Sequence, residues 1–486
     1  MSGMEPTTLA TSTGAAATAL DYKEIRDVVV TGGRNMLIRY GIVAPLSLAG
    51  TTALVRMLGA ADWGIVSVGY FLVVFLDNNF GAMLLGALVQ AREEPDPEFV
   101  AAAVALMWAV GGAVVLLACA AAAPASLAYG RAALGWALVA VAICGLVYSW
   151  RATSLALIER RLDYRTVATA EVLDQVVFYA IAIPAVLLGG GITAALIALA
   201  LRGMLSALLL RARRPVPRVG SWTRARILSL YRFAAPNLGT SAAILVSGLI
   251  PLAVLSARQG RFLGFMMTAS TIVGYAATVQ VISQRLGFAS LSRLSADAGA
   301  FRHATQRSLS LSTFVVVALA LPLGGAAPIW VPLMFGPSWK PAVTVMAWMA
   351  SATVLLSVAN IATAVLLARR RPGRTLLLNT VATAVYLLAS VLLLGFSPRL
   401  ALPIGWTIAR ALTAALALGL LLREVGANAV FRTATGLVLA AIAIPLLAAF
   451  TTSSPILGTV TVAALLALWS AAHRANLKFL VSRTLS

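Results

Sequence analysis

Long apolar runs separated by short polar gaps make up almost the whole of the 486-residue chain. A helix needs about 20 apolar residues to cross the hydrocarbon core of a bilayer, and about fourteen runs are long enough to do so. These runs cover approximately residues 35–56, 64–89, 99–123, 132–157, 166–188, 192–211, 229–256, 262–284, 309–334, 342–368, 375–396, 401–422, 433–450 and 456–473. Because no gap could hold a soluble domain, the pattern predicts an all-α polytopic membrane protein.

The charged residues fall mainly in the gaps between the runs and favour one side of the membrane. The chain is 60% hydrophobic, yet it carries a formal charge of +21 from 37 lysines and arginines and 16 acidic residues. With the N-terminus in the cytoplasm, about 27 basic residues fall on the cytoplasmic side, about six on the other side and about four inside the runs. The positive-inside rule therefore predicts that both termini face the cytoplasm. The densest cluster, at 211–226, is expected to anchor this topology and to meet anionic lipid head groups.

The chain divides into two related halves at this basic cluster. The segment Arg39–Pro45 in the first run has a counterpart at Arg232–Pro236 in the seventh. Since six helices return the chain to its starting side, the halves are predicted to be parallel repeats about an axis normal to the membrane. We expect a partly disordered cytoplasmic tail (1–33), an N-lobe of helices 1–6 (34–211), a basic cytoplasmic linker (212–228), a C-lobe of helices 7–12 (229–423), and two extra helices with a cytoplasmic C-terminus (424–486).

Four stretches carry a resemblance to a known family. They read RMLGAADWG at 56–64, IERRLDYR at 158–165 followed by Glu171, LYRF at 230–233 with Pro236 and then LSRL at 291–294, and WVPLMFGPSW at 330–339. In their order and spacing they resemble the polysaccharide and lipid-linked oligosaccharide flippases, the Wzx-type branch of the MOP exporter superfamily. The resemblance covers most of residues 34–350, whereas residues 360–486 match mainly in hydropathy.

The resemblance implies two six-helix lobes around a central cavity, with two additional helices. Family members move an undecaprenyl-diphosphate-linked sugar repeat unit from the inner to the outer leaflet by alternating access, which would place this chain in a bacterial inner membrane. Membrane lipids and the lipid-linked glycan would be its partners, and a polymerase and glycosyltransferases could work beside it. In the related lipid II flippases, cavity arginines on helices one, two and eight meet the diphosphate. The matching positions are Arg34, Arg39 and Arg285, with Arg56 a looser match.

Four further arginines lie within the apolar runs, where an ionised side chain is costly unless it faces a cavity or a partner. Arg202 and Arg410 lie near the middle of the sixth and twelfth runs, too deep to reach the interface easily, and are expected to face inward. Arg151 is expected to line the same cationic site or to neutralise a carboxylate. For Arg232, as for Arg39 and Arg285, two interpretations stay open: snorkelling to the interface, or a vestibule that captures the pyrophosphate.

Acidic and proline residues within the runs are candidates for coupling and for bending. Asp77 opens a polar interruption of the second run, and Glu171 and Asp174 share one face of the fifth helix. Each is either a coupling carboxylate or a structural partner, and Arg151 could neutralise one of the latter two. Pro45 and Pro236 fall inside the first helix of each half, where proline bends the axis, so they are candidate hinges.

The composition argues against several other classes of function. Cys119 and Cys144 lie in apolar runs and are interpreted as small core residues. Neither they nor His303 and His473 form a metal-ligand pattern, so no metal or cofactor is expected. The basic residues lack interleaved aromatics on a soluble module, which disfavours nucleic-acid binding. A drug or metabolite antiporter of the same superfamily is the alternative transporter. A membrane polymerase or ligase is the alternative from another class, but the short outward loops disfavour an enzyme.

Overall fold

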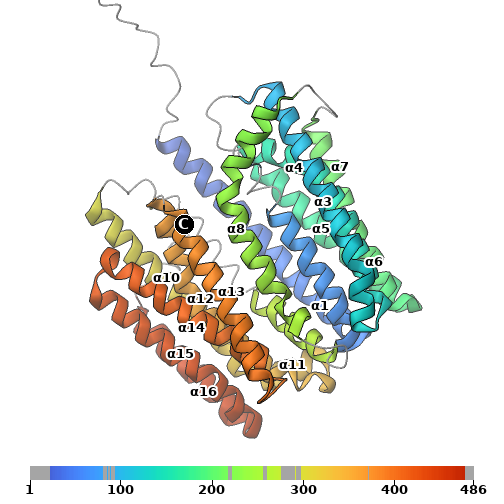
Figure 1. Ribbon diagram of the computed structural model, residues 1–486. Helices are drawn as coiled ribbons and strands as arrows, with labels where there is room; N and C mark the ends of the chain where they lie inside the picture. The colour runs from blue at the N-terminus through green and yellow to red at the C-terminus, as the bar shows by residue number, and fades with distance from the viewer. Residues whose placement is uncertain are drawn as a thin grey trace, which may run out of the picture.

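The computed structural model of this chain describes residues 22–79, 85, 88, 94–161, 163–216, 222–254, 260–274, 291, 297–369, 371–474 and 476. Over these residues the chain is helical, with short connecting turns (Figure 1). Ten helical stretches among them are long and apolar enough to cross a membrane. Of these ten, Arg165–Arg213 contains two of the predicted spans, and Val43–Asp77 overlaps two more. The chain is therefore a multi-pass helical membrane protein, and the predicted helix pattern is confirmed.

The N-lobe begins with one long helical stretch that changes direction at a glycine. This stretch, α1 (Tyr22–Asn79), is interrupted at Gly59, whose φ of 71° lies in the left-handed region that only glycine adopts readily. The remaining helices of this lobe follow in order: α3 (Pro97–Tyr129), α4 (Ala132–Arg160), α5 (Tyr164–Ala185), α6 (Gly191–Leu201) and α7 (Met204–Arg213). A π-helical turn, Val186–Gly190, joins α5 to α6, with Gly189 and Gly191 both at positive φ.

The sixth predicted helix is divided in two. The sequence predicts one helix over 192–211, but the chain turns at Arg202 and Gly203, between α6 and α7. Gly203 packs its backbone against the ring of Tyr148 on α4, and a Cβ there would lie 3.0 Å from Cδ1 of that ring. The break turns the Arg202 side chain into the lobe, where it is buried.

The C-lobe repeats this plan with its own breaks. It comprises α8 (Arg224–Val254), a helical segment over 260–274, α10 (Ala298–Gly325), α11 (Ala327–Phe335), α12 (Ala342–Ala368), α13 (Pro372–Leu394) and α14 (Ala401–Val425). The ninth predicted run, 309–334, is divided at Ala326 into α10 and α11. The two last helices, α15 (Ala427–Ser453) and α16 (Pro455–Ala472), pack on α10, and α15 also packs on α12.

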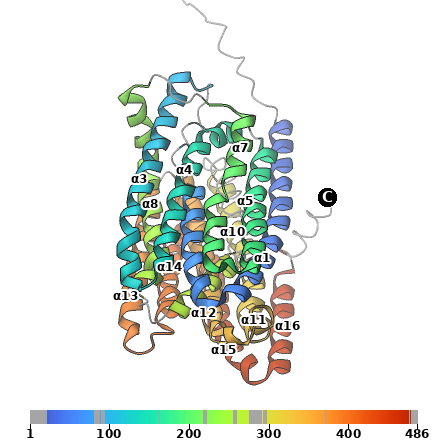
Figure 2. The same cartoon turned by 90° about the vertical axis from the view of Figure 1, so that its right-hand side faces the viewer.

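The two lobes meet along α8. This helix packs against α13 in its own lobe and also contacts α1 and α3 of the N-lobe (Figures 1 and 2). Phe71 of α1 lies over Gly248 near one end of α8. At the other end, the Arg226 guanidinium donates to the Asp96 carboxylate at 2.7 Å. The α11 helix also contacts α1, which adds a second contact between the lobes.

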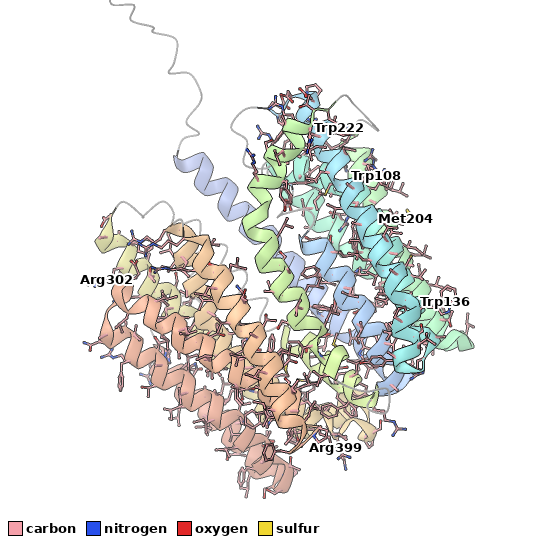
Figure 3. The ribbon with its side chains drawn as sticks, in the orientation of Figure 1. Trp108, Trp136, Met204, Trp222, Arg302 and Arg399 are labelled. Carbon is pink, nitrogen blue, oxygen red and sulfur yellow. The ribbon has the colours of Figure 1, made fainter. Side chains whose placement is uncertain are left out.

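The two ends of the bundle differ in charge. Arg302 and Trp222 lie at one end and Arg399 at the other (Figure 3); the first end is called the basic side below, and the second the outer side. Trp108 and Trp136 are exposed on α3 and α4 between the two ends. Cys144 is buried as predicted, but the prediction for Cys119 is wrong. Cys119 is exposed beside the exposed Leu116 and Leu117, because that face of α3 has no neighbouring helix to cover it.

Candidate functional site

A buried ion cluster holds the N-lobe together around Arg151 of α4. One Nη of Arg151 donates to Asp174 of α5 at 3.0 Å and to the hydroxyl of Ser206 on α7 at 2.6 Å. The other Nη donates to the carboxylate of Asp77 on α1. Arg151 and Asp174 are only 2% and 1% exposed, whereas the Asp77 side chain is 21% exposed. The expectation that Arg151 neutralises a carboxylate of α5 is met at Asp174 rather than at Glu171.

Arg202 adds a second guanidinium to the interior of the same lobe. It is 3% exposed, and its Cζ lies 4.6 Å from the centroid of the Tyr70 ring. The Tyr70 hydroxyl donates to Gln175 of α5 at 3.1 Å. Nε and Nη1 of Arg202 have no hydrogen-bond partner among the described residues. The two arginines and two aspartates carry equal and opposite charge, which limits the cost of burying them together.

Arg410 of α14 stands in a different environment, in the C-lobe. Its Cζ lies 3.9 Å from the centroid of the Trp406 ring, one helical turn earlier. That ring meets Tyr386 of α13 edge-on, with centroids 4.9 Å apart. The side chain is half-buried and forms no ion pair with any described residue. Aromatic faces stabilise the cation in part, so Arg410 is a deep guanidinium that no described carboxylate neutralises.

Arg56 lies at the outer side and joins the two lobes. It follows the first membrane-spanning part of α1, and its Nε and Nη2 donate to the carbonyl oxygens of Met334 and Leu333 at the end of α11. The last carbonyls of a helix lack partners within the helix and carry its partial negative charge, so a guanidinium is well placed there. Arg56 therefore caps α11 across the lobe boundary.

Backbone contact between glycines continues this boundary. A Cβ at Gly64 of α1 would lie 2.8 Å from the backbone nitrogen of Gly264, and a Cβ at Gly264 would overlap the carbonyl of Ala60. Only residues without a side chain allow helices to approach so closely. Trp339, 1% exposed, seals the neighbouring core against Phe265 and Phe335. We call the Arg56 and Gly64–Gly264 contacts together the outer contact.

The eight predicted cavity arginines are not gathered at one place. Arg151 and Arg202 lie inside the N-lobe, Arg410 in the C-lobe, Arg56 in the outer contact, and Arg232 is exposed on α8. The side chains of Arg34 and Arg39, and all of Arg285, lie outside the described residues. Pro45 lies inside α1 and Pro236 within the bounds of α8. Their roles as hinges stay predictions, as does a shared central cavity.

Most of the residues that surround the deep arginines were not predicted from the sequence. Ser206 comes from α7, 55 residues away, and no local pattern indicates it. Tyr148, whose ring centroid lies 4.3 Å from Cζ of Arg151, is three positions earlier on α4, a spacing that places both residues on one helix face. Trp406 was within reach, because a residue four positions before Arg410 lies on the same helix face. The Gly64–Gly264 approach also has a partial signal, since Gly260 and Gly264 form the small-xxx-small spacing typical of close helix contacts.

Comparisons with known proteins agree with this architecture. A family model described as "Polysaccharide biosynthesis protein" matches residues 53–344. Among solved structures, the lipid II flippase MurJ in an inward closed conformation matches with a TM-score of 0.64 and 11% identity, covering 90% of this chain and 98% of that one. An inward-facing multidrug resistance MATE family transporter of the MOP superfamily matches with a TM-score of 0.58 and 14% identity, covering 84% and 99%.

A MOP superfamily transporter from Pyrococcus furiosus gives a TM-score of 0.55 at 13% identity, covering 85% of this chain and 96% of that one. At these identities the matches show a shared fold. A search of curated protein sequences found no match. The predicted fold class, a polytopic helical bundle of the MOP type, is confirmed.

Proposed function

The chain belongs to the polysaccharide biosynthesis protein family, and from this premise we propose that it is a flippase for lipid-linked oligosaccharides. It would move undecaprenyl-diphosphate-linked repeat units from the inner to the outer leaflet of a bacterial inner membrane. Glycosyltransferases would build the glycan before this step, and a polymerase would act on it afterwards. The proposal rests on the family, on the MOP-type fold, and above all on the environment of Arg410.

Arg410 carries the proposal because its charge lacks a protein counter-ion. A charged side chain at membrane depth costs several kcal/mol unless it is paired or faces water. Arg151 meets two carboxylates, but Arg410 forms no ion pair with any described residue and is only half-buried. A guanidinium binds phosphate oxygens through two parallel hydrogen bonds. We assign Arg410 to the diphosphate of the cargo, which would supply the missing negative charge as it passes.

The outer contact supports alternating access as the mechanism. It joins α1 to α11 and to the segment over 260–274 through side chain to carbonyl hydrogen bonds and a narrow glycine approach. The atoms that would have to separate in this contact are a guanidinium, two carbonyl oxygens and the backbone at the glycines. We propose that this contact closes the outer side while cargo enters from the basic side, and that it opens for release.

The buried carboxylates have separate proposed roles. Asp174 is almost fully buried and forms an ion pair with Arg151, so we assign it a structural role. Asp77 is more exposed and lies at the end of α1, so we keep it as the candidate coupling carboxylate. The structure gives Glu171 no contact with Arg151, and it stays a second candidate.

The decisive experiment compares variants of Arg410 in proteoliposomes that contain an undecaprenyl-diphosphate-linked oligosaccharide. Arg410→Ala is expected to slow flipping roughly tenfold to a hundredfold, because a hydrogen bond to a charged group contributes about 1.5–3 kcal/mol. Arg410→Lys keeps the charge but loses the bidentate geometry, so its flipping rate should lie between those of the parent and Arg410→Ala. Arg432→Ala, which removes an exposed arginine of α15, is the matched control and should flip at the parent rate.

Two outcomes would contradict the proposal. Equal flipping by the parent and Arg410→Ala, with both proteins correctly inserted, would remove Arg410 from the cargo path. No flipping by the parent, together with proton-driven uptake of a small cationic drug, would favour the antiporter. Growth of the glycan chain in the same vesicles would instead indicate a polymerase.

A further inference from the structure

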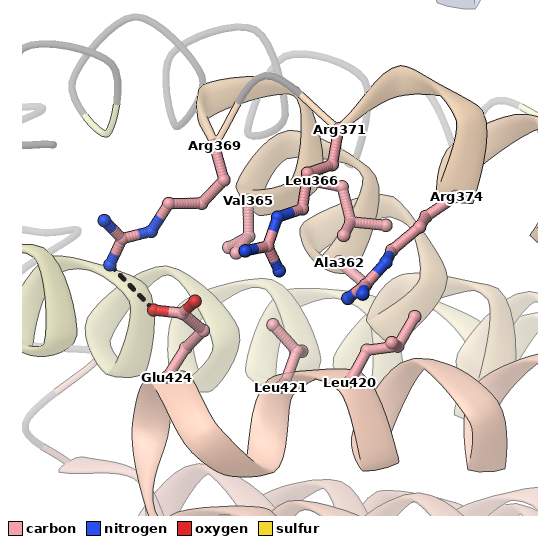
Figure 4. A pocket seen from close by; sticks show the side chains of 9 residues that line it. All are labelled: Ala362, Val365, Leu366, Arg369, Arg371, Arg374, Leu420, Leu421 and Glu424. Atoms are coloured by element: carbon pink, nitrogen blue, oxygen red, sulfur yellow. Dashed lines mark hydrogen bonds and ion pairs between the residues drawn. The ribbon is translucent and has the colours of Figure 1, made fainter.

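A pocket with a cationic rim and an apolar floor lies at the basic side of the C-lobe (Figure 4). It is bounded by the end of α12, the start of α13 and the last turns of α14. Arg369, Arg371 and Arg374 form its rim, together with Glu424. The floor consists of apolar side chains, Ala362, Val365, Leu366, Leu420 and Leu421. The enclosed volume is only about 20 Å³, so a ligand would be held at the mouth by the rim.

The charges of this rim are only partly neutralised. Glu424 accepts a hydrogen bond from Arg369 at 2.9 Å, and the Arg369 guanidinium lies over the Phe301 ring at 4.0 Å. Arg371 and Arg374 are exposed, extend over the pocket floor, and form no ion pair with any described residue. Three guanidinium groups therefore face one carboxylate, which leaves an excess of positive charge over an apolar floor.

The N-lobe carries a more polar, arginine-lined pocket at the corresponding place. It lies between the start of α5 and the end of α7, and it is lined by Arg165, Arg213, Leu209, Asp163 and two threonines. A hydrogen bond from the Thr166 hydroxyl lowers the pKa of Asp163, which caps α5. Both lobes thus set two or more arginines where the fifth helix begins beside the sixth, although the lobes share little sequence there.

We propose that the C-lobe pocket binds the phosphate head group of an anionic phospholipid in the adjacent leaflet, with the N-lobe pocket as its counterpart. The rim supplies guanidinium donors that match phosphate oxygens. The floor, and the exposed Leu377 that follows along α13, offer apolar surface to the acyl chains. Basic pockets between membrane helices on the cytoplasmic side recognise such lipids in general. The site is distinct from Arg410 and does not depend on the cargo.

The test measures lipid binding to the purified full chain by native mass spectrometry. The parent is titrated with phosphatidylglycerol and, separately, with phosphatidylcholine of the same chain length. The double variant Arg371→Gln/Arg374→Gln should bind phosphatidylglycerol more weakly by about tenfold or more, because it removes two guanidinium groups that would hydrogen-bond to the phosphate held in the pocket. The control Arg224→Gln/Arg432→Gln removes two exposed arginines on the same side outside the pocket and should bind like the parent.

A second variant separates binding from folding. Leu420→Trp fills the pocket floor and keeps every charge, and it should also weaken phosphatidylglycerol binding. The melting temperature of each variant is measured to show that it is folded. Equal binding of the two lipids by the parent, or unchanged phosphatidylglycerol binding by both pocket variants, would overturn the proposal. Binding of inorganic phosphate alone with the same dependence on Arg371 and Arg374 would assign the pocket to free phosphate and overturn the lipid assignment.

Discussion

At the scale of single residues, the same side chain has opposite roles in the two lobes. Arg151 is enclosed by two carboxylates and a hydroxyl from three other helices, so its charge is neutralised within the protein. Arg410 rests on an aromatic ring and keeps its charge available. Both arginines lie within apolar runs of similar composition. Their difference comes from the carboxylates that the fold places beside one of them, and for this reason we propose a structural role for Arg151 and a transport role for Arg410.

This distinction predicts a large energetic coupling between Arg151 and Asp174. Arg151→Ala should lower the free energy of unfolding by about 3–5 kcal/mol, because it leaves a buried aspartate without its partner. Arg151→Ala/Asp174→Ala should be less destabilised than the sum of the single variants, with a coupling of about 2 kcal/mol. The measurement is unfolding in mixed detergent micelles, followed by circular dichroism.

The control cycle uses the Arg131–Asp62 pair, which is joined at 2.5 Å but has side chains 40% and 33% exposed. Exposed pairs couple by about 0–1 kcal/mol. If the buried pair coupled no more strongly than this exposed pair, the structural role of Arg151 would be wrong.

At the scale of elements, glycines decide where helices break and where they touch. Gly59, Gly189 and Gly191 allow the chain to turn between membrane-spanning helices at positive φ. Gly64 and Gly264 instead permit two helices to meet backbone to backbone at the outer contact. Pro45 and Pro236, predicted as hinges, lie within α1 and α8, the helices that carry or adjoin the lobe boundary. Their roles as hinges stay predictions.

Gly264→Ala should shift the lobes toward the state that is open on the outer side. An added Cβ would overlap the Ala60 carbonyl, and overpacking of this kind costs about 1–3 kcal/mol. Gly260→Ala is a close control, because a Cβ there meets no atom within 4 Å. The measurement is double electron–electron resonance between spin labels placed on the outer ends of α3 and α16. A distance distribution unchanged in Gly264→Ala, or changed equally in Gly260→Ala, would contradict the closing role of this contact.

At the scale of the whole molecule, the distribution of basic residues predicts the orientation in the membrane, and the arrangement of the two lobes bears on the proposed transport path. Arg369, Arg371 and Arg374 lie at the end that carries Arg302, while Arg399 lies at the opposite end (Figure 3). The positive-inside rule places the first end in the cytoplasm. In that orientation the outer contact would lie on the far side, where we propose that it closes the path, and both arginine-rimmed pockets would face the inner leaflet.

Cysteine labelling of cells tests this orientation. In a background with Cys119→Ser and Cys144→Ala, Arg399→Cys should react with a membrane-impermeant maleimide in intact cells. Arg302→Cys should react only after permeabilisation, because about 27 of the basic residues hold that side in the cytoplasm. The reverse pattern would invert the topology, and with it the direction in which the cargo is proposed to move.

Much of the architecture followed from short-range patterns. Runs such as 132–157 and 342–368 became α4 and α12 almost unchanged, because a helix in hydrocarbon must satisfy its own backbone. The run at 309–334 was divided into α10 and α11, since an apolar run reports burial and not the exact place where a helix ends. The candidate site was less predictable. A pairing of Arg151 with Glu171 or Asp174 was predicted because their helices follow one another in the sequence. The third member of the cluster, Asp77, was not linked to them, because it lies 74 residues before Arg151.

The sequence alone determined that the chain crosses a membrane many times, in which orientation it is expected to do so, and which charges lie deep, because these depend on the local balance of apolar and charged residues. Only the tertiary structure decided which deep arginines are neutralised, which glycines face one another, and which surface arginines share a pocket. These properties depend on groups brought together from distant parts of the chain, and electrostatic and packing energies follow distances in space rather than along the sequence.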